Sequence, residues 1–187
     1  MDKKFDRCLK VILDSMGGFS NNPSDPGYKG GLSEEEVDRI RRRKEVVVPP
    51  DISMIDEEKY WFMVRSSYWR RCRCNILPWP IDLMVLGTAM KTKDPLEAIR
   101  LIQNTLFAIL GKEAIFETNG KFTPNTQKYL NACLEKPEHV KIFAQVMLEI
   151  CAKTKNGSSQ DDAAKNIGFF SGERFSMIRD EIGKLPK

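Results

Sequence analysis

The chain has 187 residues, of which 41 % are hydrophobic and 30 % are charged, and its formal net charge is +4. This composition excludes a disordered or fibrous protein. The length suits one domain, or one domain with a small attached part, that buries a core without disulfide bonds. A charge of this size permits an anionic partner such as nucleic acid, anionic lipid or a cell-wall polymer, without requiring one.

The first residues of the chain do not have the pattern of a secretion signal, because Asp6, Arg7 and Lys10 interrupt the apolar positions. No run of about 18 apolar residues occurs either, so we expect no helix that spans a membrane. These features predict a protein that is cytoplasmic as made. Any release to the periplasm or cell wall would then use a route without a signal peptide.

Five cysteines, an odd number, occur in the chain: Cys8, Cys72, Cys74, Cys133 and Cys151. Cys8 and Cys151 repeat in phase with apolar residues, which favours buried, reduced thiols. Cys72 and Cys74 with the single histidine, His139, offer ligands for zinc, but their spacing matches no common zinc-finger pattern. We therefore expect structural thiols, and neither a metal nor another cofactor.

The first predicted helix carries one apolar stripe at helical spacing, formed by Phe5, Cys8, Leu9, Ile12, Leu13 and Met16. Gly17-Gly18 predicts its end, because glycine adopts the left-handed conformation that closes a helix. Residues 20–27 are then rich in Asn, Asp, Pro and Gly, which favour turns. A long loop directly after a helix is a common location for a functional site.

Three further helices are predicted in the first half of the chain. Ser33 with Glu36 forms a capping box, and that helix ends in a basic cluster over residues 39–44. Asp56 starts a helix whose apolar and aromatic positions are Tyr60, Trp61, Val64, Tyr68 and Cys72. Residues 81–90 are apolar on nearly all sides, which predicts a buried central helix.

The second half of the chain is also predicted to be helical. Asp94 and Pro95 start a helix that ends at Gly111, and further helices cover residues 124–133, 137–153 and the C-terminus. Residues 113–122, which contain Asn119-Gly120, suit a short hairpin or a loop. The predicted fold class is therefore mostly α, with six to eight helices and at most one small hairpin.

The order of these landmarks resembles the glycoside hydrolase 108 family. These are lysozyme-like N-acetylmuramidases that include phage endolysins and secretion activator proteins. The family's first helix ends in a His-Glu-Gly-Gly-Tyr type motif, followed by an Asn-Asp-Pro-x-Asp-Pro-Gly-Gly loop. The corresponding residues here are Ser15-Met16-Gly17-Gly18-Phe19 and Asn21-Asn22-Pro23-Ser24-Asp25-Pro26-Gly27. The family's Tyr-Trp…Cys…Leu-Pro element is similar to Tyr68-Trp69, Cys74 and Leu77-Pro78.

The C-terminal part resembles the helical module of the family that is often called peptidoglycan-binding. The similar positions are Ala98, Ile102-Gln103, Asn119-Gly120, Thr123 to Thr126 and Gly172-Glu173-Arg174. The resemblance implies a lysozyme-like helical fold with a hydrolase-like part over residues 1–92. It also implies a peptidoglycan-binding-like part over residues 93–187, packed on the first, and glycan strands of peptidoglycan as the partner.

The family's catalytic acid is the glutamate of its Glu-Gly-Gly motif, and Met16 occupies that position here. Protonating a glycosidic oxygen requires a carboxyl group, which methionine lacks. Ser15 replaces the preceding histidine, and Leu86-Gly87 replaces a Phe-Asp pair of the family. The resemblance therefore implies a muramidase-like protein with degenerate or lost glycosidase activity and no assigned catalytic residue. Rescue by Asp14, about 200° round the helix, or by Glu34 to Glu36 stays open.

The resemblance assigns substrate binding to Asn22, Asp25, Tyr28 and Trp69. Turn stabilisation by Asn22 and Asp25, and core packing by Tyr28 and Trp69, are the alternatives. A nucleic-acid-binding role for the basic residues 39–44 and 70–73 also stays open, although acidic runs at 34–36 and 56–58 weaken their field. A protein-interaction module that reuses the scaffold is a third alternative, and the sequence indicates no oligomeric state.

Overall fold

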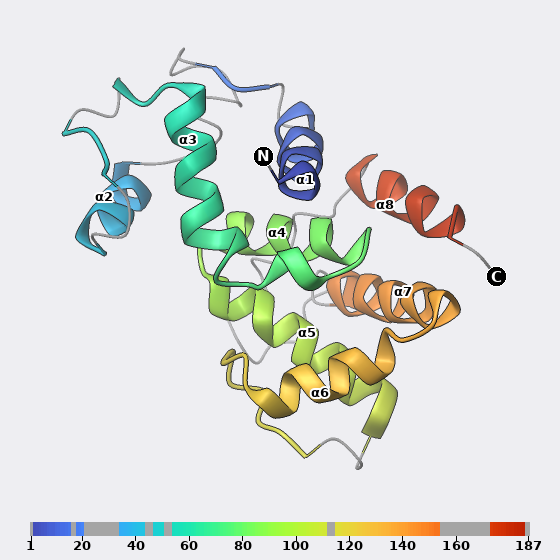
Figure 1. Ribbon diagram of the computed structural model, residues 1–187. Helices are drawn as coiled ribbons and strands as arrows, with labels where there is room; N and C mark the ends of the chain where they lie inside the picture. The colour runs from blue at the N-terminus through green and yellow to red at the C-terminus, as the bar shows by residue number, and fades with distance from the viewer. Residues whose placement is uncertain are drawn as a thin grey trace. The chain divides into compact units, whose positions relative to one another are not determined.

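The computed structural model describes residues 2–15, 18–20, 34–43, 47–50, 54–111, 115–153 and 173–185. Within these ranges the chain forms eight α-helices, two short helical turns and no β-sheet, which confirms the predicted mostly α fold class (Figure 1). By its internal packing the chain divides into two compact units, Met1–Asn75 and Ile76–Lys187. None of the helices in the described ranges is long and apolar enough to cross a bilayer.

The N-terminal unit contains α1 (Lys3–Asp14), α2 (Glu34–Arg42), α3 (Glu57–Val64) and a π-helical turn η3 (Arg65–Trp69). A 3-10 turn, η4 (Cys74–Ile76), follows at the boundary between the units. The predicted apolar stripe of α1 is confirmed, because its members from Phe5 to Leu13 are at most 4 % exposed. Met16, the last predicted member, lies outside the described residues.

Helix α3 begins at the predicted N-cap, since the Asp56 carboxylate accepts a hydrogen bond from the Lys59 amide at 2.8 Å. The backbone then widens into η3, where the Arg70 amide donates to the Arg65 carbonyl at 3.0 Å. This five-residue step places Trp69 on the same side as Val64, and both are buried. The predicted stripe is otherwise confirmed by buried Tyr60, Val64, Tyr68 and Cys72, whereas Trp61 is half-buried.

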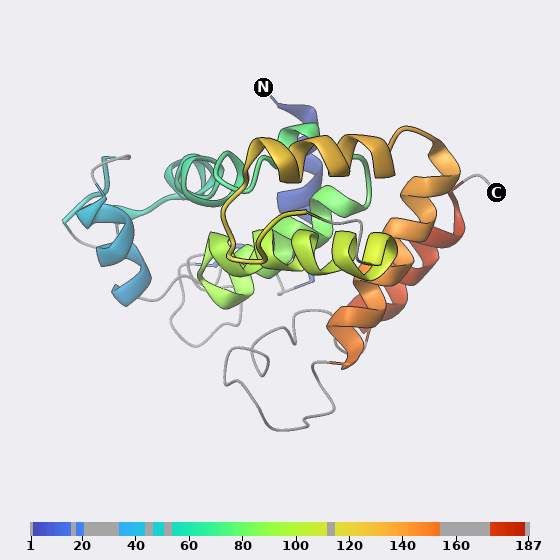
Figure 2. The same cartoon turned by 90° about the horizontal axis from the view of Figure 1, so that it is seen from below.

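The C-terminal unit contains α4 (Ile81–Thr92), α5 (Pro95–Leu110), α6 (Pro124–Cys133), α7 (Pro137–Lys153) and α8 (Glu173–Gly183). Helix α4 is buried at every residue from Ile81 to Ala89, which confirms the predicted central helix. Helix α5 packs against α4, α6 and α7, and α8 lies along α7 (Figures 1 and 2). The Trp79 indole donates to the Glu181 carboxylate at 2.8 Å and so ties α8 to the start of α4.

Local sequence signals set the ends of these helices. Asp94 accepts a hydrogen bond from the Leu96 amide at 3.0 Å, and Thr123 accepts one from the Thr126 amide at 3.2 Å. Gly111 ends α5 with a φ of +59°, a conformation that glycine adopts without strain. For residues 113–122 the sequence allowed a short hairpin or a loop. The described residues 115–123 form a loop without strand pairing.

The five cysteines are thiols outside any disulfide bond, as the sequence predicted, and four of them are buried. Burial raises the pKa of the Cys151 thiol from 9.0 to about 12, because an apolar environment disfavours the thiolate. Partial burial also raises the pKa of Cys133. Cys133 and Cys151 therefore stay protonated near neutral pH.

Candidate functional site

The end of α1 is the place where the sequence predicts the functional site. Met16, Asn22, Asp25 and Tyr28 lie outside the described residues, so their roles stay predictions. The structure describes the chain up to Ser15, before Met16, and again from Gly18, after it. Before it, the Ser15 amide bonds the Val11 carbonyl at 3.2 Å. After it, Gly18 has a φ of +87° and its amide bonds the Leu13 carbonyl at 2.8 Å, which confirms that glycine closes the helix here.

Asp14 and Ser15 directly precede Met16, which the resemblance places at the family's acid position. The Ser15 hydroxyl donates a hydrogen bond to the Ile12 carbonyl at 2.6 Å, so this side chain is engaged with its own helix. The Asp14 side chain is exposed to solvent. Neither residue is placed in buried, apolar surroundings of the kind that typically hold the acid of a glycosidase.

The other carboxyl groups described in the N-terminal unit are also exposed or half-exposed: Asp2, Asp6, Asp38, Asp56, Glu57 and Glu58. Three of them have structural partners. Asp2 and Asp56 cap helices, and Asp38 pairs with Arg41 on α2. The side chains of Glu34 to Glu36 lie outside the description, so their candidacy as a displaced acid stays open.

An aromatic cluster holds α1 in the unit. The Phe5 ring meets the Trp61 ring edge-on at 6.1 Å between centroids and the Trp69 ring at 5.5 Å. The Arg65 guanidinium lies 5.2 Å from the centre of the same Phe5 ring, within the range of a cation–π contact. These contacts give the first helix a fixed position within the N-terminal unit.

Trp69 is the predicted sugar-binding residue that the structure does describe. Its side chain is 1 % exposed, and its indole N–H donates to the Asp2 carboxylate at 3.0 Å. These surroundings fit the core-packing alternative, in which Trp69 supports α1. Stacking on a sugar requires an accessible ring face, and the Trp69 side chain is almost fully buried. A direct sugar contact by Trp69 therefore stays a prediction.

Phe19 is a residue whose role the sequence analysis did not predict beyond its place in the motif. Its ring packs on the Tyr60 ring of α3, with 5.5 Å between centroids and 40° between the ring planes. Phe19 thus attaches the chain directly after Gly18 to α3. Helical periodicity could not reveal this contact, because Phe19 lies beyond the last turn of α1.

Part of the basic cluster on α2 has a structural role. The Arg41 guanidinium donates to the carbonyl oxygens of Pro49 at 2.6 Å and Pro50 at 3.0 Å, and it also pairs with Asp38. This arginine therefore holds the chain after α2 rather than lying free for phosphate groups. Within the described parts of the chain, no three His, Cys, Asp or Glu side chains gather as metal ligands.

A second constellation lies in the C-terminal unit, where the buried amide of Gln103 fixes the loop between α5 and α6. Its carbonyl oxygen accepts from the Gly120 amide at 2.9 Å, and its NH2 group donates to the Lys121 carbonyl at 2.9 Å. The same NH2 group lies 3.5 Å from the Thr126 hydroxyl. Gln103, Gly120 and Thr126 are positions of the predicted C-terminal module, and here they act as a clamp on the loop.

Comparison with known families finds a match over part of the chain. The profile of the family described as glycosyl hydrolase 108 matches residues 9–92, from the first turns of α1 to the last residue of α4. Comparison with curated proteins finds no match to the chain. The family match covers the Gly-Gly motif, the turn-rich loop and the Tyr68-Trp69 element, and the family is one of lysozyme-like peptidoglycan hydrolases. Residues 9–92 are therefore similar to the glycosyl hydrolase 108 family.

Proposed function

We propose that this chain binds the glycan strands of peptidoglycan and has lost most or all of the hydrolase activity of its family. The proposal is carried by Met16, which the resemblance places at the position of the family's catalytic glutamate. A thioether has no proton to donate to a leaving oxygen. The setting that we propose is that of a phage endolysin or a secretion activator protein.

The surroundings of Met16 support this proposal. The helix that leads to it is capped, aromatic side chains hold it in place, and Gly18 closes it as the motif requires. The Ser15 hydroxyl is bonded to a backbone carbonyl, and Asp14 is exposed. A retained frame without its acid fits a protein that keeps glycan binding after it has lost cleavage.

Within the proposal, Asn22, Asp25 and Tyr28 supply hydrogen bonds and an aromatic face to the glycan. Trp69 contributes as a buried support of α1, which its hydrogen bond to Asp2 favours. The C-terminal part over residues 93–187 acts as a second, peptidoglycan-binding part of the same protein.

Co-sedimentation with purified peptidoglycan sacculi tests the proposed binding. We expect the unsubstituted chain to sediment with sacculi without releasing soluble muropeptides. Asp25→Ala and Tyr28→Ala should each weaken binding about tenfold, as expected for the loss of a charged hydrogen bond or a stacked ring. Glu58→Ala, which removes an exposed carboxylate of α3, is the matched control and should bind normally.

Two results would contradict the proposal. Failure of the unsubstituted chain to sediment with sacculi would exclude glycan binding. Release of muropeptides by the same chain would show that another carboxyl group performs the acid chemistry.

A further inference from the structure

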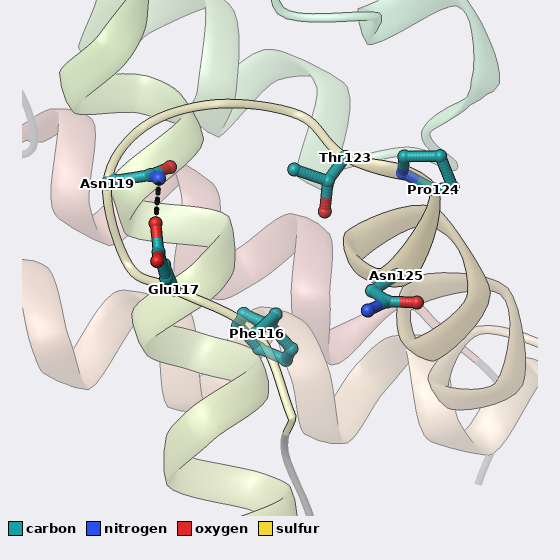
Figure 3. Close-up of a pocket in the computed structure, with 6 residues that line it drawn as sticks. All are labelled: Phe116, Glu117, Asn119, Thr123, Pro124 and Asn125. Atoms are coloured by element: carbon teal, nitrogen blue, oxygen red, sulfur yellow. Dashed lines mark hydrogen bonds between the residues drawn. The ribbon is translucent and has the colours of Figure 1, made fainter.

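The loop between α5 and α6 forms a hollow within the C-terminal unit. Its volume is about 390 Å³, and six residues line it: Phe116, Glu117, Asn119, Thr123, Pro124 and Asn125. Glu117 and Asn119 lie on one side, Thr123, Pro124 and Asn125 lie on the other, and Phe116 lies between them (Figure 3). This volume falls within the range of small-molecule sites in proteins.

Glu117 and Asn119 present a hydrogen-bond acceptor and a donor next to each other. The Asn119 NH2 group donates to one carboxylate oxygen of Glu117 at 2.6 Å, and the Asn119 carbonyl oxygen accepts from the Lys121 amide at 2.9 Å. Within the part of the chain that the structure describes, the second oxygen of Glu117 and the second N–H of Asn119 remain for a ligand. Adjacent groups of this kind suit two neighbouring hydroxyl groups, each of which both donates and accepts.

Phe116 adds an apolar surface beside these polar groups. Its half-buried ring packs on the Tyr129 ring of α6, with 5.6 Å between centroids and 48° between planes. This contact holds the Phe116 ring in place beside the hollow that it lines, so that little entropy is lost on binding. The C–H groups of a pyranose ring form the apolar face that such an aromatic surface accommodates.

The hollow is held in shape before any ligand binds. The clamp formed by Gln103 bonds the chain on both sides of the Gly120–Lys121 peptide. The loop also runs back along α5 (Figure 2), so that Gly120 lies against the Leu96 backbone. A preformed site loses less conformational entropy on binding than a mobile loop would.

We infer that this hollow binds one pyranose residue of a glycan strand. The Glu117–Asn119 pair would bond two neighbouring polar substituents of the sugar, and its ring would lie on Phe116. The inference rests on the proposed peptidoglycan-directed function and deepens it, because it gives the C-terminal unit a sugar site with named residues. An ammonium ligand fits less well, since it would leave the Asn119 donor without a partner.

Titration of the ¹⁵N-labelled full chain with the tetrasaccharide of N-acetylglucosamine tests the inference. We expect saturable shifts of the NMR signals of residues 116–125, including the side-chain NH2 group of Asn119. Glu117→Gln removes the charge but keeps an oxygen for Asn119, and it should raise the dissociation constant about tenfold. Glu135→Gln, at an exposed site between α6 and α7, is the matched control and should leave it unchanged.

The location of the shifts separates this inference from the proposed function. Shifts that are confined to residues 18–28 would overturn the C-terminal site and leave glycan binding by the N-terminal loop in place. No shifts anywhere, together with no binding to sacculi, would contradict both. Saturable shifts of residues 116–125 with lysine amide, but not with the tetrasaccharide, would replace the sugar by an ammonium ligand.

Discussion

Gly120 lies where the loop between α5 and α6 passes over the first turn of α5. Its φ is +77°, and a Cβ atom built on it would lie 2.8 Å from the Leu96 carbonyl oxygen and 2.9 Å from the Leu96 Cβ. The nearest atom is the Leu96 backbone oxygen, which cannot move away as the end of a flexible side chain can. Both the conformation and the space at this residue therefore require glycine.

Gly120→Ala should lower the free energy of unfolding by about 1–3 kcal/mol, because alanine adds strain and a steric conflict at one position. Urea denaturation followed by circular dichroism measures the change. Gly183→Ala is the control, since a Cβ there has nothing within 4 Å and its φ is not positive. Helix propensity predicts a small gain, at most about 1 kcal/mol, for the control. Equal changes in the free energy of unfolding for the two substitutions would show that Gly120 is not packed closely against Leu96 of α5.

Among the elements, α1 depends on Asp2 in two ways. One carboxylate oxygen caps the helix by accepting from the Lys4 amide at 3.2 Å and the Phe5 amide at 3.4 Å. The other oxygen accepts from the Trp69 indole at 3.0 Å. A single side chain thus both starts the helix and attaches it to the π-helical turn η3.

Asp2→Ala should destabilise the protein by about 2–3 kcal/mol, as the sum of a lost cap and an indole donor left without its partner. Asp2→Asn keeps one acceptor oxygen and should cost about 1 kcal/mol. Urea denaturation gives these values, and tryptophan fluorescence reports whether the surroundings of Trp69 change. Asp56→Ala removes the cap of α3 together with the exposed ion pair to Lys59, and should cost about 1 kcal/mol. A loss from Asp2→Ala no larger than that from Asp56→Ala would contradict the double role.

Much of each helix could be predicted from local sequence, because caps and apolar spacing are local signals. Asp56, Asp94 and Thr123 start helices as predicted, and Gly18 and Gly111 end them. The π-helical turn could not be predicted, since one wider turn leaves no mark on a pattern of apolar residues. Trp69 lies in this turn and is buried, which fits the core-packing alternative for that residue.

At the scale of the whole molecule, the family could be predicted from the order of motifs, and the match over residues 9–92 supports it. The hollow beside Phe116 could not be predicted, because its shape depends on Gln103 reaching across from α5. The family match and the structural packing also divide the chain at different points. The family match ends at residue 92, whereas the compact units divide at 75/76, since α4 packs against α5. The proposed division at 92/93 stays a prediction.

The central claim is that the frame of a peptidoglycan hydrolase is present here without its acid. The most direct test compares the unsubstituted chain with Met16→Glu in a peptidoglycan cleavage assay, with chromatography of the released muropeptides. Met16→Gln, which has a similar size but no proton to donate, is the matched control.

We expect no cleavage by the unsubstituted chain or by Met16→Gln, and measurable cleavage by Met16→Glu. General acid catalysis contributes on the order of 10²–10⁴-fold, so even partial restoration should be detectable. Cleavage by the unsubstituted chain, undiminished in Met16→Gln, would contradict the account and identify another carboxyl group as the acid.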